Sequence, residues 1–129
     1  MNILLFLTPK IEVAYLDSDF TIRQAAKKMY HHGYTVVPVL DKDGKYVRSV
    51  SEGDIFRYML ENNLKEEDLE KYNILELGME RDIKAIKIDK NMEDLIDMAI
   101  NQNFIPVLDD EDKFIGIVTR KKIIEQFKK

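Results

Sequence analysis

Two short stretches of the chain each place a hydroxyl side chain three residues before a group that could contact a ligand. In Ser51-Glu52-Gly53-Asp54 that group is a carboxylate, and in Thr119-Arg120-Lys121-Lys122 it is a cation. A carboxylate can accept two hydrogen bonds from a cis-diol. A helix that begins at the hydroxyl residue offers N–H groups and partial positive charge to a phosphate, and nearby cations complete such an anion site. We name these stretches the Ser51–Asp54 element and the Thr119–Lys122 element.

Each element also has a purely structural interpretation. A serine followed three residues later by an acid is a common helix N-cap. Three consecutive cations are typical of a solvated charged face. Cations at a helix start oppose the helix dipole, however, and this conflict favours an anionic partner. Both interpretations stay open for both elements.

The two elements belong to an internal repeat in which corresponding residues lie 68 positions apart. Pro38-Val39-Leu40-Asp41 recurs as Pro106-Val107-Leu108-Asp109, and Val50-Ser51 recurs as Val118-Thr119. An internal repeat indicates a supersecondary unit that cannot bury its apolar face alone. Two copies therefore predict a paired module, and the seam of such a pair is a natural place for a ligand. The copies differ at one notable position, where Arg48 corresponds to Gly116.

Composition narrows the possible functions. The 129 residues are 45% hydrophobic and 34% charged with a net charge of −4, which predicts one compact, soluble domain built from two halves. The acidic balance argues against a nucleic-acid partner. The absence of cysteine excludes disulfides, thiolate metal sites and thiol nucleophiles. The apolar runs are far shorter than the roughly 20 residues of a membrane helix, and no signal peptide is expected, so we predict a cytoplasmic protein without a membrane partner.

Hydrophobic periodicity predicts the order strand–helix–strand–strand–helix in both copies. Thr21 and Gln24 form a capping-box pattern before a helix to His32, and Gly33 suits the left-handed residue after it. The remaining elements of the first copy are strands over 12–17, 35–40 and 46–50 and a helix that carries Ile55, Phe56, Met59 and Leu60 inward. In the second copy we expect strands over 83–88, 104–108 and 114–118, a helix capped by Asn91, and a last helix holding Ile123, Ile124 and Phe127. Residues 1–7 are expected to be a short helix or extended lead-in, and residues 62–72 a charged surface helix or linker.

This order, with the Ser51–Asp54 and Thr119–Lys122 elements at matching places, resembles the CBS domain, and the tandem resembles a CBS pair, or Bateman module. The resemblance covers nearly the whole chain. It implies an α/β (α+β) fold of two β-α-β-β-α units related by a pseudo-twofold axis, with the sheets packed together and the helices outside. The boundaries expected from it are 1–61 for the first unit with its lead-in, 62–73 for an acidic linker or helix, and 74–129 for the second unit.

The resemblance implies a regulatory module that binds an adenine nucleotide in clefts between the two units and signals to a protein partner. AMP, ADP, ATP and cyclic di-AMP are the candidate regulatory ligands, and no cofactor is expected. Segments 7–10, 33–35 and 101–107 resemble small bacterial stand-alone CBS-pair proteins, whose members include cyclic di-AMP-binding proteins. Carried over by position, one cleft takes Ser51, Asp54, Gln102, Asn103 and Phe104. The other, more cationic cleft takes Thr8, Lys10, Tyr34, Thr35, Val36, Thr119, Arg120 and Lys122.

Lys122 departs from the family pattern because it stands where the family has an aspartate, and a lysine cannot accept from a sugar diol. The same cleft is the more cationic one, which fits a ligand rich in phosphate. The missing acid favours, for this cleft, an alternative in which the pair is a ligand-free dimerisation or interaction module. The resemblance also implies a homodimer through the C-terminal helix of each unit. An enzyme is disfavoured, because the sequence has no Ser-His-acid set, no metal cluster and no Gly-rich phosphate loop. His31 and His32 suit a helix end without a metal, and Tyr34 either packs on the seam or stacks on a base.

Overall fold

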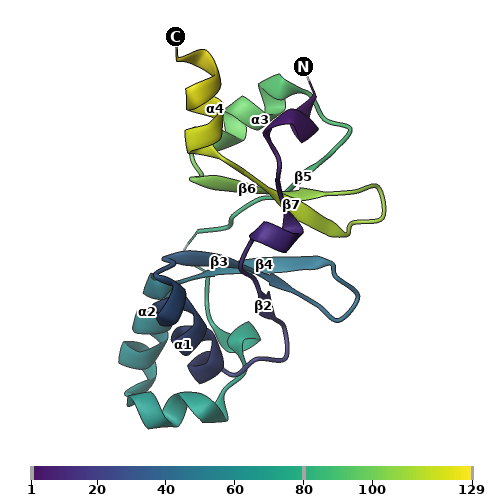
Figure 1. Ribbon diagram of the computed structural model, residues 1–129. Helices are drawn as coiled ribbons and strands as arrows, with labels where there is room; N and C mark the ends of the chain where they lie inside the picture. Colours follow the sequence, from purple (N-terminus) through teal and green to yellow (C-terminus); the bar gives the residue numbers. More distant parts are fainter. Residues whose placement is uncertain (1, 80, 129) are drawn as a thin grey trace. The chain divides into compact units, whose positions relative to one another are not determined.

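The structure is a computed structural model that describes residues 2–79 and 81–128. The chain forms two compact units, and each unit combines one repeat with segments from elsewhere in the chain. The first-repeat unit comprises residues 15–42, 47–79 and 81–82, and the second-repeat unit comprises residues 2–14, 43–46 and 83–128. The predicted mixed α/β class is confirmed (Figure 1). The boundaries at 1–61, 62–73 and 74–129 divide the chain along its sequence and stay a prediction.

A three-stranded sheet covered by two helices forms the first-repeat unit. The strands are β2 (Leu16–Asp17), β3 (Val36–Leu40) and β4 (Tyr46–Ser51), in the order β2-β3-β4, and the helices are α1 (Ile22–His32) and α2 (Glu52–Asn62). β2 and β3 are parallel, with Leu16 opposite Val39. Both helices lie on the same face of the sheet (Figure 1). The arrangement places the start of α2 directly at the end of β4.

Local sequence signals explain where α1 begins and ends. The Thr21 hydroxyl accepts from the Gln24 N–H at 3.1 Å, and the Gln24 side chain accepts from the Thr21 N–H at 2.8 Å. This reciprocal capping box satisfies two N–H groups at the helix start. At the other end, Gly33 adopts a left-handed φ of 71°, which glycine tolerates without strain. The predicted helix over residues 22–32 is confirmed.

The second-repeat unit contains a four-stranded sheet in the order β1-β7-β6-β5. Its strands are β1 (Thr8–Pro9), β5 (Ile86–Lys87), β6 (Phe104–Leu108) and β7 (Phe114–Thr119), and its helices are α3 (Met92–Ala99) and α4 (Arg120–Phe127). α3 begins at Asn91, whose side chain accepts from the Asp94 N–H at 2.9 Å, as predicted. The apolar core of this unit draws on both ends of the chain and consists of Ile3, Phe6, Ile86, Leu95, Ala99, Ile105, Val107, Val118 and Ile123.

The N-terminal lead-in is part of the second-repeat unit. Two short 3₁₀ turns, η1 (Ile3–Phe6) and η2 (Lys10–Glu12), flank β1, which pairs antiparallel with β7. Pro9 lies opposite Gly116, and a Cβ on Gly116 would stand 2.2 Å from the Thr8 carbonyl oxygen. Glycine is therefore the residue that lets the lead-in approach β7 closely.

Two expectations about the elements are wrong, namely the length of two strands and the inward side of one helix. The expected strands over 12–17 and 83–88 shrink to the two-residue strands β2 and β5. The segment 62–72, which was expected to be a charged surface helix or linker, contains a 3₁₀ turn, η3 (Glu66–Lys71), and a second one, η4 (Ile74–Glu76), follows. Phe56 and Leu60 do not point inward: both are exposed, while Ile55 is buried. An amphipathic helix buries one stripe of its surface, and α2 uses that stripe for Ile55.

Candidate functional site

The Thr119–Lys122 element lies where β7 ends and α4 begins. The Thr119 hydroxyl accepts from the Lys122 N–H at 3.1 Å, and the Arg120 N–H donates to the Asn103 carbonyl at 2.8 Å. The first turn of α4 contains no acidic residue, whereas α2 and α3 both have acids there. Three cations therefore stand at the positive end of the α4 dipole, without the acid that would compensate them.

An open cleft of about 590 Å³ adjoins this helix start. Its volume lies within the range of small-molecule sites, which is about 300–1,000 Å³. The cleft is lined by residues of β7, α4 and the segment before β6, namely Asn103, Thr119, Arg120, Lys121, Ile124, Glu125 and Lys128. Thr119 and Arg120, which were predicted for the more cationic cleft, thus lie beside Asn103, which was predicted for the other cleft, and Lys122 is not among the lining residues.

Arg120 has structural contacts that its place in the sequence did not reveal. Its guanidinium donates to the carbonyls of Ala99 at 2.7 Å and Ile100 at 3.4 Å, and to the Asn103 side chain at 2.8 Å. Ala99 and Ile100 form the C-terminal end of α3, where the helix dipole favours a cation. Arg120 therefore connects the end of α3 to the start of α4, which accounts for one of the three cations at the helix start.

Lys121 and Lys122 differ from Arg120 because both are exposed. Within residues 2–79 and 81–128, neither ammonium group takes part in a hydrogen bond or an ion pair. Two cations at the positive end of a helix repel the dipole and each other, and an anionic ligand relieves both repulsions. These two lysines are the uncompensated charge of the element.

The predicted lead-in residues lie at increasing distance from α4. Thr8 pairs with Ile117, two residues before Thr119 along β7. Lys10 lies further along, because its ammonium is 3.7 Å from the position that a Cβ on Gly44 would take. Each strand residue spans about 3.4 Å, so Lys10 stands on the side of the Gly44 turn rather than beside the start of α4.

Tyr34, Thr35 and Val36 belong to the first-repeat unit. Tyr34 is exposed, and its ring stacks on His32 with centroids 5.7 Å apart. The Thr35 carbonyl accepts from the Glu52 N–H at 2.9 Å, which repeats the contact between Asn103 and Arg120. Val36 begins β3. The backbone before each proline-containing strand thus supports the start of the last helix of the same unit.

Gln102 and Phe104 are also tied into their own unit. The Gln102 side chain is buried, accepts from the Lys84 N–H at 2.9 Å, and donates to the carbonyls of Lys84 and Phe104. These bonds connect the segment before β5 to the first residue of β6. The Gln102 side chain therefore serves the fold and leaves only neighbouring backbone groups for a ligand.

The Ser51–Asp54 element forms a complete capping box at the start of α2. The Asp54 N–H donates to the Ser51 hydroxyl at 3.0 Å, and the Ser51 N–H donates to Asp54 Oδ2 at 2.9 Å. Asp54 is 6% exposed, and its carboxylate also contacts Arg48 Nη2 at 3.3 Å and Arg57 Nη2 at 3.4 Å. Protein donors therefore surround the carboxylate that was expected to accept from a sugar.

Arg48 is the residue whose role the sequence did not predict, although its mismatch with Gly116 in the repeat was the available signal. It is 8% exposed and donates to the carbonyls of Ser49 at 3.1 Å, Leu77, and Gly78 at 3.0 Å. Because buried charges require partners, these carbonyls and Asp54 together satisfy the guanidinium.

The chain matches the CBS domain family twice, at residues 7–61 and 73–129. These matches cover most of the chain, and the chain therefore belongs to the CBS domain family. The predicted resemblance to a tandem CBS pair is confirmed. Among the described residues, no helix combines the length and apolar character needed to cross a membrane.

Several relatives are small CBS-pair proteins. The chain is 26% identical over 125 residues to cyclic di-AMP receptor B of Bacillus subtilis, covering 96% of this chain and 84% of the relative. It matches the crystal structure of CbpB in complex with c-di-AMP with a TM-score of 0.89, 25% identity, and coverage of 98% and 84%. CbpB of Listeria monocytogenes in complex with c-di-AMP matches with a TM-score of 0.84, 27% identity, and coverage of 94% and 90%. The chain spans 63% and 20% of the lengths of two further curated relatives, which are 27% and 28% identical to it.

Proposed function

We propose that this CBS pair is a regulatory module that binds an adenine nucleotide, with cyclic di-AMP as the first candidate and AMP, ADP and ATP as the others. The observation that carries the proposal is the pair of uncompensated lysines at the start of α4: Lys121 lines the open cleft, and Lys122 follows it in the same exposed turn. Relatives of similar length that are named for cyclic di-AMP, or were crystallised with it, support this candidate.

Each group of the element has a role in this proposal. Cyclic di-AMP carries two anionic phosphodiester groups, which suit the two lysine ammonium groups and the positive end of the helix. Thr119 caps the helix and fixes the direction of its first N–H groups, and Arg120 holds Asn103 beside the cleft. The ligand contacts expected for Thr8, Lys10, Tyr34, Thr35 and Val36 stay predictions.

A thermal unfolding screen with these nucleotides and S-adenosylmethionine tests the proposal. A ligand at a hundredfold its dissociation constant stabilises the folded protein by about 2.7 kcal/mol. For a chain of this length, that corresponds to a rise in Tm of about 8–10 °C if both units unfold together. No rise in Tm with any of these compounds would contradict nucleotide binding.

Lys122→Ala locates the site, and Lys27→Ala is the matched control because Lys27 is an exposed lysine in the middle of α1. Loss of a charged hydrogen bond to phosphate weakens binding by about 1.5–3 kcal/mol, which is about ten- to a hundredfold in Kd. Without ligand, Lys122→Ala removes a repulsion with the α4 dipole and raises stability by about 0.3 kcal/mol. Equal nucleotide affinity of the two variants would place the ligand elsewhere.

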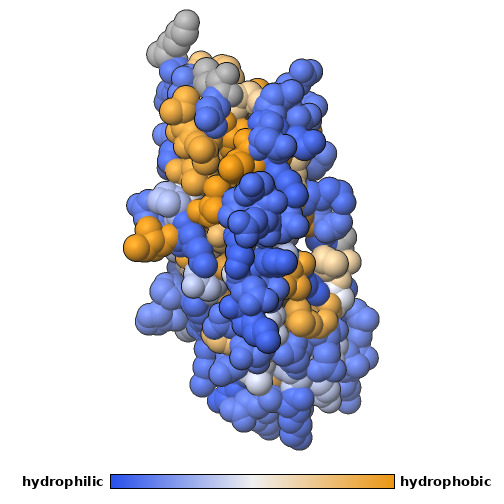
Figure 2. All heavy atoms as spheres, turned by 90° about the vertical axis from the view of Figure 1, so that its right-hand side faces the viewer, coloured by the Kyte–Doolittle hydropathy of each residue, from blue (hydrophilic) through white to orange (hydrophobic). Residues whose placement is uncertain are grey.

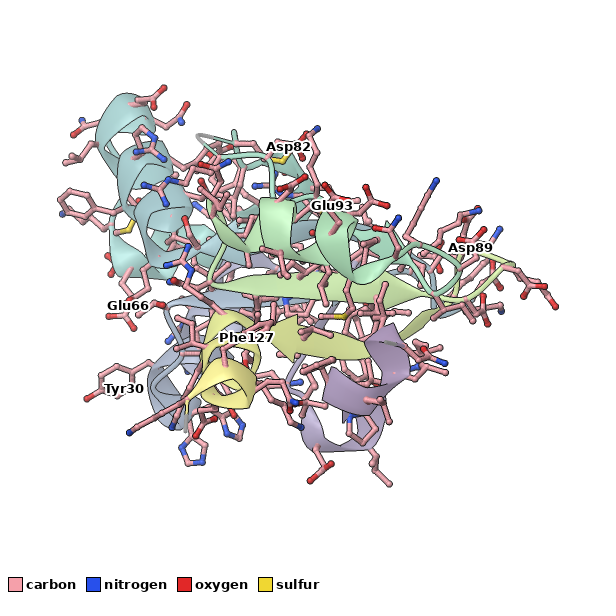
Figure 3. The ribbon with its side chains drawn as sticks, turned by 90° about the horizontal axis from the view of Figure 1, so that it is seen from above. Tyr30, Glu66, Asp82, Asp89, Glu93 and Phe127 are labelled. Carbon is pink, nitrogen blue, oxygen red and sulfur yellow. The ribbon has the colours of Figure 1, made fainter. Side chains whose placement is uncertain are left out.

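We also propose that the module is a homodimer formed through α2 and α4. Phe56 and Ile124 occupy equivalent positions of the two repeats and are 63% and 59% exposed, and Phe127 is 62% exposed (Figure 3). Figure 2 shows apolar side chains gathered on the second-repeat unit, whose exposed apolar residues include Leu4, Leu5, Ile11, Ile96, Ile100, Ile124 and Phe127. Exposed apolar surface of this kind is typical of an interface.

Light scattering after size-exclusion chromatography measures the mass of the assembly. Phe127→Glu should convert the dimer to a monomer. Tyr30→Glu is the control, because Tyr30 is an exposed aromatic residue that points away from α1 (Figure 3). A wild-type monomer at micromolar concentration would contradict the dimer, and dissociation by both variants would contradict the assignment to α4.

A ligand-free interaction module is the second candidate, and the contacts of Asp54 with Arg48 and Arg57 favour it. It predicts an intact dimer whose Tm does not respond to any nucleotide. In the first candidate, a protein partner reads the liganded state, which requires that the ligand binds two states of the module with different affinity. We propose no catalytic activity, so a nucleotide incubated with the protein should be recovered unchanged by chromatography.

A further inference from the structure

Gly116 and Arg48 occupy equivalent positions of the two repeats, and each contacts a segment that precedes a repeat in the sequence, but the two contacts differ. In the second repeat, Pro9 of the lead-in lies directly opposite Gly116, where a Cβ would stand 2.2 Å from the Thr8 oxygen. The residue 68 positions after Pro9 is Leu77, and the residue 68 positions before Gly116 is Arg48. Among the described residues of the segment around Leu77, none pairs with β4, and the Arg48 guanidinium donates to the carbonyls of Leu77 and Gly78 instead.

This arginine changes what the first repeat can bind. Asp54 has about four acceptor positions on its two oxygens. The Ser51 N–H, Arg48 and Arg57 each approach one of these oxygens, and the side chain is almost completely buried. The corresponding Lys122 is exposed and unpaired within the described part of the chain. In the first repeat, the charge of Asp54 is thus neutralised by arginines of the protein itself. In the second repeat, the charge of Lys122 has no such partner among the described residues.

From this difference we infer that Arg48 determines how many nucleotides one chain binds: it withholds Asp54 from ribose, so that only the Thr119–Lys122 element takes a ligand. The inference rests on the proposed function. A ribose diol would have to displace a guanidinium held by three backbone carbonyls and Asp54. It would replace charge-assisted donors with neutral hydroxyls, whose hydrogen bonds are about half as strong.

Isothermal titration of the wild-type protein with cyclic di-AMP, and separately with AMP, measures the number of binding sites. The expected result is one equivalent per chain. Lys122→Ala should weaken binding by about tenfold or more. Asp54→Asn keeps the size of the side chain and should bind with the affinity of the wild type. Arg48→Gly removes the buried guanidinium from Asp54 and introduces the residue type of position 116, and it should bind a second equivalent.

The outcomes separate this inference from the proposed function. Two equivalents per wild-type chain, or weaker binding by a folded Asp54→Asn variant, would overturn the inference and leave nucleotide binding intact. A folded Arg48→Gly variant that still binds one equivalent would also overturn it. If the wild type binds no nucleotide, the proposed function fails. In that case, nucleotide binding by Arg48→Gly would still support the inference that Arg48 withholds Asp54 from a ligand. If Arg48→Gly also binds no nucleotide, the inference is overturned as well. If Arg48→Gly does not fold, the stoichiometry of the wild type and Asp54→Asn decide.

Discussion

A double-mutant cycle on Arg48 and Asp54 measures whether the buried ion pair stabilises the first-repeat unit. The two side chains are 8% and 6% exposed, and Nη2 lies 3.3 Å from Oδ2. Removing one partner of a buried pair leaves the other charge uncompensated, which costs about 3–5 kcal/mol. We expect Arg48→Met to fall in this range, because it also removes the donors to the carbonyls of Leu77 and Gly78.

The other variants of the cycle have smaller expected effects. Asp54→Asn keeps an acceptor for the Ser51 N–H, and Arg48 keeps its carbonyl partners, so the loss is about 2–3 kcal/mol. The coupling energy should be about 1–2 kcal/mol, in the lower half of the range for contacting residues, because 3.3 Å is long for a charge-assisted hydrogen bond. Arg57→Met is the control: Arg57 contacts the same carboxylate at 3.4 Å but is 40% exposed, so its loss should be at most about 1 kcal/mol.

Hydrogen exchange of the β3 amides reports the stability of the first-repeat unit separately from that of the other unit. Urea unfolding monitored by circular dichroism provides an independent value. Additivity of the two single variants within about 0.5 kcal/mol would refute the energetic coupling. An Arg57→Met loss as large as that of Arg48→Met would show that burial does not distinguish the two arginines.

Two further predictions concern the second-repeat unit. Gly116→Ala should lose about 2–5 kcal/mol of stability, because it combines backbone strain with the clash against Thr8. Gly33→Ala is the control, because Gly33 also has a left-handed φ but a Cβ added there would meet no atom of the described residues beyond its chain neighbours within 4 Å. It should lose only about 1–2 kcal/mol of stability in a urea titration. Equal losses of stability in the two variants would refute the clash at Gly116. The hydrogen bond and attraction to Asp112, 3.0 Å away, raise the pKa of Lys87 above its ordinary value. The stability that this ion pair contributes to the folded protein is therefore fully present below the pKa of Lys87 in the unfolded state. It is lost as the pH rises through the pKa of Lys87 in the folded state. Asp112→Asn should lower the Lys87 pKa in an NMR titration, and an unchanged value would contradict this cause.

Elements with a local signal were predictable from sequence. The capping box at Thr21 and the left-handed Gly33 define α1, and Asn91 defines the start of α3. These signals act over a few residues, so the sequence contains all the information that they need. The short strands β2 and β5 were overestimated because their length depends on pairing with β3 and β6, which lie more than fifteen residues away along the chain.

The sequence suggested candidate site residues, but it did not predict their contacts. The repeat identified Ser51, Asp54 and Lys122 as corresponding groups. It could not show that Arg48 reaches Leu77, 29 residues away, or that it contacts Asp54 in doing so. Arg120 shows the same limit, because its cation opposes the α4 dipole locally but caps α3 across the unit. Long flexible side chains find such distant acceptors only after the fold has formed.

Backbone amide chemical shifts, followed during a titration with cyclic di-AMP, show which of the two elements binds the nucleotide. We expect the amide signals of Lys121 and Lys122 to shift with a single saturating dependence on ligand concentration, while those of Ser51 and Asp54 do not shift. Shifts centred on Ser51 and Asp54, or no shift at Lys121 and Lys122 at millimolar ligand, would contradict it.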